Sequence, residues 1–197
     1  MKSPSRPELI LASTSAYRRA LLERLGVAFR CESPAFDEEA FPREGLAPRA
    51  LAEALARGKA EAVAAGRPDA VVVGCDQLVA LEGRVLGKPG DADRAVDQLA
   101  AMSGRTHELI TAMVVLARGR RFEHTDVSRL TMRRLDRAVL ERYVARDRPV
   151  DCAGSYKLER GGIALFERIE SQDHTAITGL PLLALVGILA ELGVDAP

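Results

Sequence analysis

The sequence has 197 residues, of which 47% are hydrophobic and 28% charged, a composition typical of globular proteins that excludes an intrinsically disordered chain. Lys plus Arg and Asp plus Glu both number 28, and the resulting net charge of zero argues against a broad nucleic-acid-binding surface. The three cysteines, Cys31, Cys75 and Cys152, form no CxxC pattern. This indicates neither a disulfide framework nor a zinc site, and it favours a cytoplasmic location.

The apolar segments predict no association with a membrane. Residues 1–8 are polar and lack the apolar core of a signal peptide. The longest apolar stretch, residues 180–192, is shorter than the ~20 residues needed to cross a bilayer. We expect residues 1–197 to form one domain with a shared core.

Strands and helices are mixed along the chain. A short apolar run at residues 9–12 predicts a buried strand, and Ser15 is expected to cap a helix over residues 16–25. The next predicted elements are a helix over residues 48–65 and a strand over residues 70–81 that turns back into a short strand.

In the second half, Asp91 is expected to cap a third helix that closes at residues 103–104. Further expected elements are two paired strands (110–117 and 122–135), a helix (136–146), irregular strands (163–169) and a C-terminal helix. This order predicts an α/β fold.

Arg18 continues a stripe of leucines on the first helix, one turn nearer to the helix start. There it would project beside the free N–H groups that follow the Ser13-Thr14-Ser15 loop, so this segment is a candidate phosphate site. The alternative is a surface arginine after an ordinary capping serine.

Lys59 continues the stripe of Leu51 and Leu55 on the apolar side of the second helix, next to Gly58. Two alternatives stay open for this lysine. Its ammonium group either reaches solvent along the apolar surface or binds an anionic ligand.

Asp76 and Gln77 lie inside the apolar β-strand segment. A buried carboxylate is costly, so Asp76 is expected to meet a cation or a metal. Lys88 follows after a hairpin-length interval and could return to the same edge. The alternative is a hairpin with an incidental acid.

Two further segments carry charged residues that are candidates for ligand contact. The small residues of segment 152–162 leave room for a ligand, and Lys157 and Glu159 would share a face if this segment were extended. Glu38 belongs to an acidic triplet, which is usually solvated, so only its position in the fold could assign it a role.

In this order, these segments resemble the Maf family of nucleotide pyrophosphatases. The resemblance rests on residues 9–22, 37–38, 59, 74–77, 87–89, 153–157 and 179–181, and it extends from about residue 8 to 192. It implies an α/β fold similar to inosine triphosphate pyrophosphatases, with a mixed sheet and helices in two lobes around a cleft. It also implies hydrolysis of a nucleoside triphosphate to the monophosphate and pyrophosphate, with Mg²⁺ or Mn²⁺ as cofactor.

The resemblance also implies roles for individual residues. Asp76 would be the catalytic proton acceptor, and Glu38 and Asp76 would bind the metal. The substrate phosphates would contact Ser13, Ser15, Arg18, Lys59, Lys88 and Lys157. Family members are often dimeric, so a homodimer is a further expectation.

Besides Ala16, which stands where the family usually has proline, three positions depart together from the commonest family pattern. Tyr17 stands in place of arginine, Gln77 in place of threonine and Glu159 in place of glutamine. The subgroup that cleaves 7-methyl-GTP is similar at all three, although it typically has tryptophan in place of Tyr17. An aromatic ring attracts the cationic methylated base, and Glu159 could accept hydrogen bonds from it. The departures therefore predict 7-methyl-GTP as the substrate.

Other functions remain open at this stage. Within the same reaction, the substrate could be dTTP, UTP or another noncanonical nucleotide. From a different class, the chain could bind nucleotides without turnover and inhibit cell division, because the family has been associated with septum formation. A cysteine nucleophile and RNA binding through basic turns are the weaker alternatives.

Overall fold

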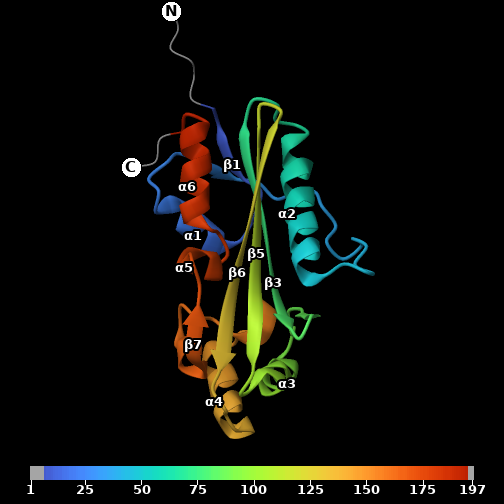
Figure 1. Ribbon diagram of the computed structural model, residues 1–197, viewed down its shortest axis with the longest axis vertical. Helices are drawn as coiled ribbons and strands as arrows, with labels where there is room; N and C mark the ends of the chain where they lie inside the picture. Colours follow the sequence, from blue (N-terminus) through green and yellow to red (C-terminus); the bar gives the residue numbers. More distant parts are fainter. Residues whose placement is uncertain (1–6, 195–197) are drawn as a thin grey trace, which may run out of the picture. The chain divides into compact units, whose positions relative to one another are not determined.

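The computed structural model describes residues 7–194 and has a mixed α/β fold (Figure 1). In chain order, the elements are β1 (Leu9–Leu11), α1 (Ala16–Glu23), β2 (Arg30–Cys31), α2 (Pro48–Ala64), β3 (Val71–Leu81), β4 (Arg84–Leu86), α3 (Ala92–Met102), β5 (Thr106–Ala117), β6 (Arg120–Met132), α4 (Arg137–Asp147), the 3₁₀ helices η1 (Ala153–Ser155) and η2 (Gly161–Leu165), β7 (Phe166–Glu170), α5 (His174–Ile177) and α6 (Leu182–Glu191). The strands follow the order β2-β1-β3-β5-β6-β7, and β4 also pairs with β3. The predicted fold class is confirmed.

The chain divides into two compact units. The first unit contains the chain up to Asp76, the segment Thr111–Asp126 and the chain from Asp173 onward. The second unit contains Gln77–Ile110 and Val127–Gln172. This division agrees with the two lobes that the family resemblance implies.

In the first unit, helices cover both faces of the strands (Figure 1). β1 pairs in parallel with β3, with Leu9 opposite Val71. Side chains alternate between the two faces of a strand. One face packs against α1 and α6, through buried residues that include Leu9, Leu11, Val71, Val73, Cys75, Leu22 and Leu185. The opposite face packs against α2 through Ile10, Ala12, Val72 and Val63.

Gly74 allows α2 to pack directly on β3. A Cβ atom at this position would lie 2.5 Å from the carbonyl oxygen of Ala56 and 2.6 Å from the backbone nitrogen of Ala60. Because side chains alternate along a strand, Asp76 lies on the same face as Gly74 and is directed toward α2. The close approach of helix and strand therefore brings the α2 side chains within reach of Asp76.

The local signals for helix starts are confirmed. Ser15, Asp91 and Asp136 each accept a hydrogen bond from a backbone N–H group in the first turn of the helix that follows. α1 ends at Glu23, two residues earlier than predicted. β5 begins at Thr106 and is longer than predicted, whereas β6 covers Arg120–Met132 and both begins and ends earlier than the predicted strand over residues 122–135.

The segment around Lys157 is not extended, so the condition under which Lys157 and Glu159 would share a face is not met. Residues 153–155 form η1, and a turn follows over residues 158–160, so Lys157 and Glu159 do not alternate along an extended strand. Instead, Lys157 is buried and Glu159 is exposed. The irregular strands expected over residues 163–169 are also only partly present, because η2 occupies residues 161–165. Within residues 7–194, no helix is long and apolar enough to span a bilayer.

Candidate functional site

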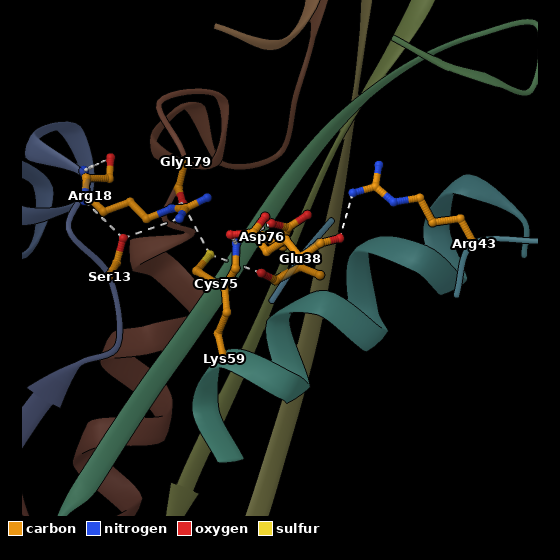
Figure 2. A network of polar contacts seen from close by, with 10 residues as sticks. Ser13, Arg18, Glu38, Arg43, Lys59, Cys75, Asp76 and Gly179 are labelled. Carbon is orange, nitrogen blue, oxygen red and sulfur yellow. Dashed lines mark hydrogen bonds and ion pairs between the residues drawn. The ribbon is translucent and has the colours of Figure 1, made fainter. Parts of the chain in front are cut away.

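Asp76 forms a buried ion pair with Lys59 of α2 in the first unit (Figure 2). Lys59 Nζ lies 2.6 Å from Asp76 Oδ1, and the two side chains are 7% and 6% exposed. The same ammonium group lies 2.9 Å from Glu38 Oε1, which belongs to a half-exposed side chain. The other oxygen of Asp76, Oδ2, is buried and has no hydrogen-bond partner in the part of the chain described.

This arrangement confirms the expectation that a buried Asp76 meets a cation. Pairing with Lys59 offsets the cost of removing the carboxylate from water. It also decides one alternative for Lys59, because the ammonium group is buried against two carboxylates and does not reach solvent. Of the two alternatives that the sequence left open, the solvent-reaching lysine is therefore excluded.

The loop that carries Glu38 packs against α2 through Phe36. The Phe36 ring fills the space beside Gly58, where a Cβ atom would lie 2.3 Å from the ring. Arg43 donates a hydrogen bond of 2.8 Å to the backbone carbonyl of Glu38 (Figure 2). The glycine inside α2 thus allows the loop to place Glu38 beside Lys59.

Arg18 lies beside the loop that precedes α1, as the helical stripe predicted (Figure 2). Its Nη1 donates to Ser13 Oγ at 3.4 Å, and its Nε donates to the carbonyl oxygen of Gly179 at 3.0 Å. Ser13 Oγ also accepts a hydrogen bond from the backbone N–H of Ser15. A hydroxyl has one donor and two acceptor sites, so Ser13 has its O–H group to donate. Ser13, Arg18 and the start of α1 together offer donors suited to an anion.

Ser15 acts as the capping residue of α1. Its Oγ accepts a hydrogen bond of 3.4 Å from the backbone N–H of Arg18. The capping alternative is therefore confirmed for Ser15, whereas the surface-arginine alternative is wrong, because the Arg18 guanidinium is held by Gly179 and Ser13.

The carbonyl oxygen of Gly179 connects the Arg18 group to β3. It accepts hydrogen bonds from Arg18 Nε and from the thiol of Cys75, at 3.0 and 3.2 Å. Gly179 lies in the turn between α5 and α6. Asp173 holds this turn because its carboxylate accepts from the backbone N–H groups of Thr175 and Leu183. The first unit thus contains two polar groups on β3: one joins Ser13, Ser15 and Arg18 to Gly179, and the other joins Glu38 and Lys59 to Asp76.

Neither Cys75 nor Cys152 has the properties of a nucleophile. Burial raises the pKa of the Cys75 thiol to about 11. Burial, with a contribution from the adjacent Asp151 carboxylate, raises the pKa of Cys152 to about 12. Since the thiolate is the reactive form, both groups are unreactive thiols at neutral pH.

The second unit carries the other candidate residues. Lys88 is exposed between β4 and α3. Lys157 is buried, and its Nζ lies 2.8 Å from Asp151 Oδ1. Its backbone N–H donates to the hydroxyl group of Tyr143 on α4. Glu159 lies in the exposed turn that follows.

Two specificity candidates remain. Tyr17 is half-buried in the first turn of α1, and Gln77 is half-buried on β3 directly after Asp76. Both make contacts with other groups.

A buried histidine in the second unit is not part of these groups. His107 Nε2 lies 3.1 Å from the Tyr156 hydroxyl, and its ring packs against Tyr156 and Phe166. Its Nδ1 is buried with no hydrogen-bond partner among residues 7–194. Burial lowers the pKa of His107 to about 4, so the ring is neutral at pH 7.

Comparison with known proteins identifies the family. The model of the family described as Maf-like protein matches residues 8–192. The chain is 52% identical to the 7-methyl-GTP pyrophosphatase of Bdellovibrio bacteriovorus, over 92% of this chain and 95% of that protein. It is 49% identical to the 7-methyl-GTP pyrophosphatase of Xanthomonas oryzae pv. oryzae, over 97% of this chain and 100% of that protein.

The chain belongs to the Maf family. The resemblance inferred from the ordered sequence motifs is therefore confirmed. A weaker match among solved structures is the Ham1 protein of Staphylococcus aureus, with 15% identity and a TM-score of 0.45 over 64% of this chain and 71% of that chain.

The residues present fit the divalent cation that the Maf family implies. Within residues 7–194, no group of three or more His, Cys, Asp or Glu side chains is placed to hold a metal. The carboxylates of Glu38 and Asp76 both contact Lys59 Nζ and so lie close together. Asp76 Oδ2 lacks a hydrogen-bond partner among the same residues. Magnesium commonly binds through one or two carboxylates, waters and substrate phosphates, so this donor set suits it.

Sequence reasoning missed the Gly179 carbonyl as the group that orients Arg18. The Gly-Leu-Pro segment at residues 179–181 was part of the family resemblance, but a backbone acceptor leaves no signature of residue type. The thiol of Cys75 donates to the same carbonyl, a structural role that the sequence pattern does not indicate.

Proposed function

We propose that this chain hydrolyses 7-methyl-GTP to 7-methyl-GMP and pyrophosphate with a divalent cation, and so clears a noncanonical nucleotide from the cytoplasmic pool. The observation that carries the proposal is the buried Asp76 carboxylate, with Oδ1 on Lys59 and Oδ2 without a partner in the described chain. The names of the relatives, together with Tyr17, Gln77 and Glu159, support 7-methyl-GTP as the substrate.

Asp76 would act as the proton acceptor. Its Oδ2 accepts a proton from a water molecule while the water oxygen attacks the α-phosphorus. The bond between the α-phosphorus and the oxygen that bridges to the β-phosphorus then breaks, and pyrophosphate leaves with the bonding electrons. The ion pair with Lys59 fixes the orientation of the carboxylate during this step.

The phosphate oxygens would be bound by cationic and hydroxyl side chains. In the first unit, these are Ser13, Ser15, Arg18 and Lys59, of which Arg18 is already oriented by Gly179. In the second unit, they are Lys88 and Lys157. Positively charged donors stabilise the charge that develops on the leaving pyrophosphate.

Glu38 and Asp76 would hold the divalent cation. When bound, a magnesium or manganese ion neutralises charge on the phosphate oxygens and on the leaving group. The Glu38 side chain is half-exposed, so it can turn toward a ligand without leaving a buried charge behind.

Three residues would select the base. Tyr17 offers an aromatic ring to the cationic 7-methylguanine, and Glu159 offers a carboxylate to its N–H groups. Gln77 adds an amide next to Asp76. The exposure of Glu159 is consistent with contact to a ligand that arrives from solvent.

The test is a substrate panel with a matched pair of variants. The protein is incubated with Mg²⁺ or Mn²⁺ and equal concentrations of 7-methyl-GTP, GTP, dTTP and UTP, and the monophosphate and pyrophosphate are quantified. Asp76→Asn should abolish turnover, whereas Asp69→Asn, the same change at an exposed aspartate, should leave it unchanged.

Each outcome of the panel has a separate meaning. Preferred cleavage of dTTP or UTP would keep the reaction and refute the roles of Tyr17, Gln77 and Glu159. A stable nucleotide complex without any product would refute catalysis and favour the nucleotide-binding regulator. For Glu159 alone, Glu159→Gln should reduce the preference for 7-methyl-GTP over GTP, and an unchanged ratio would exclude its role.

A further inference from the structure

A single side chain of α3 joins the two loops of the second unit that carry Lys88 and Lys157. Ser155 Oγ donates a hydrogen bond of 2.7 Å to Gln98 Oε1. Gln98 Nε2 donates one of 3.0 Å to the carbonyl oxygen of Gly87. Gln98 thus bridges the residue that precedes Lys88 and the residue two positions before Lys157.

The Ser155 end of this bridge lies in strained backbone. Ser155 is fully buried and has a φ of 61°, in the left-handed region that non-glycine residues rarely adopt. Such conformations cost roughly 1–3 kcal/mol and persist where the surroundings hold them. No larger residue fits in place of the neighbouring Gly154, because a Cβ atom at this position would lie 2.9 Å from side-chain atoms of both Val79 and Tyr156. The hydrogen bond to Gln98 is a constraint from outside the loop.

Additional contacts fix the ends of the same two loops. The backbone N–H of Gly90 donates to the carbonyl oxygen of Val150 at 3.0 Å. The Tyr143 hydroxyl accepts the backbone N–H of Lys157. α3 packs against both η1 and α4. The backbone hydrogen bond between Gly90 and Val150 also connects the two loops. Gln98 adds a side-chain bridge between Gly87 and Ser155, close to the two lysines.

We propose that Gln98 is a positioning residue for the polyphosphate of the substrate. It sets the separation of the Lys88 and Lys157 loops, and through them the separation of the two ammonium groups that would bind the phosphates. This inference rests on the proposed function. The physical reason is that a lysine binds phosphate as a mobile point charge, so the geometry of the site depends on how firmly the backbone is held.

The experiment measures KM and kcat for 7-methyl-GTP in Gln98→Met, which retains the length of the side chain and loses both hydrogen bonds. We expect KM to rise about tenfold and kcat to change less than threefold, because binding of the phosphates weakens while the reaction at Asp76 is retained. A merely structural role would lower the fraction of folded enzyme and the apparent kcat, and leave KM unchanged. Gln172→Met, at an exposed glutamine, is the control and should leave both constants unchanged.

Two further variants test the two halves of the bridge. Gln98→Glu can still accept from Ser155, but it places a carboxylate against the Gly87 carbonyl, so KM should also rise. Ser155→Ala removes the hydroxyl group that donates to Gln98 Oε1. If Gln98 acts through Ser155, the double variant Gln98→Met/Ser155→Ala should raise KM no more than Gln98→Met alone.

The outcomes separate this inference from the proposed function. An active wild-type enzyme whose KM is unchanged in Gln98→Met would overturn the positioning role and leave the proposed function intact. Additive effects in the double variant would also overturn it. Absence of turnover in the wild type would refute the proposed function itself, and the inference with it.

Discussion

The buried Lys59–Asp76 pair makes a prediction about stability that can be tested without substrate. Lys59→Met retains the length and apolar stem of the side chain and removes only the ammonium group. Asp76 would then keep a charge at a side chain that is 6% exposed, without its counter-ion. Removal of one partner from a buried ion pair typically costs about 3–5 kcal/mol, so we expect a loss of this size in the free energy of unfolding.

The measurement is urea-induced unfolding followed by circular dichroism at pH 7, with a chelator present to exclude metal ions. Asp76→Asn and the double variant Lys59→Met/Asp76→Asn complete a double-mutant cycle. Because the double variant leaves no charge buried, it should be about 2 kcal/mol more stable than Lys59→Met alone. Lys88→Met removes the same charge from an exposed site and should change the free energy by less than about 0.5 kcal/mol.

Two results would refute this reasoning. A loss below about 1 kcal/mol in Lys59→Met would mean that the pair is effectively solvated. Changes that add within about 0.5 kcal/mol in the cycle would mean that the two charges do not stabilise each other in the folded protein.

Three further predictions concern other features. Mn²⁺ without nucleotide should raise the unfolding temperature of Lys59→Met more than that of the wild type, since the ammonium group and the metal compete for the same carboxylates; equal shifts would exclude competition. Gly74→Ala should cost about 3 kcal/mol in urea unfolding because its Cβ meets backbone atoms of α2, whereas Gly66→Ala, in open space, should be tolerated. Burial lowers the pKa of His107 from 6.5 to about 4, so between these pH values the unfolded chain binds a proton that the folded one does not. The free energy of unfolding should therefore fall by roughly 3 kcal/mol as the pH falls through this range. In His107→Gln, the free energy of unfolding should depend less on pH over the same range.

Much of the site could be predicted because its residues violate local patterns. Lys59 interrupts an apolar helical stripe, and Asp76 interrupts an apolar strand. Each violation has an energetic cost that must be offset, and the structure shows that the two offset each other. The capping residues could be predicted for a different reason, since a cap depends on the three or four residues that follow it.

The remaining features depend on contacts between distant segments. Arg18 and Gly179 are 161 residues apart, and a carbonyl acceptor carries no sequence signal. The sequence left open whether the segment around Lys157 is extended, and the left-handed backbone of Gly154 and Ser155 makes it turn. Gln98 gave no signal at all, because a glutamine on an amphipathic helix is normally solvated.

The composition of the first unit has a consequence for synthesis in the cell. This unit contains three separate stretches of the chain, and the segment from Asp173 onward is translated after the other two. That segment supplies α6, whose leucines fill the core against β1 and β3, and Gly179, which holds Arg18. A ribosome-bound chain that has not yet emerged beyond α4 therefore exposes the apolar face of these strands. The orientation of Arg18 by Gly179 is therefore completed only after this segment has been translated, so a chain truncated before Asp173 would lack both the α6 part of the core and the acceptor that holds Arg18.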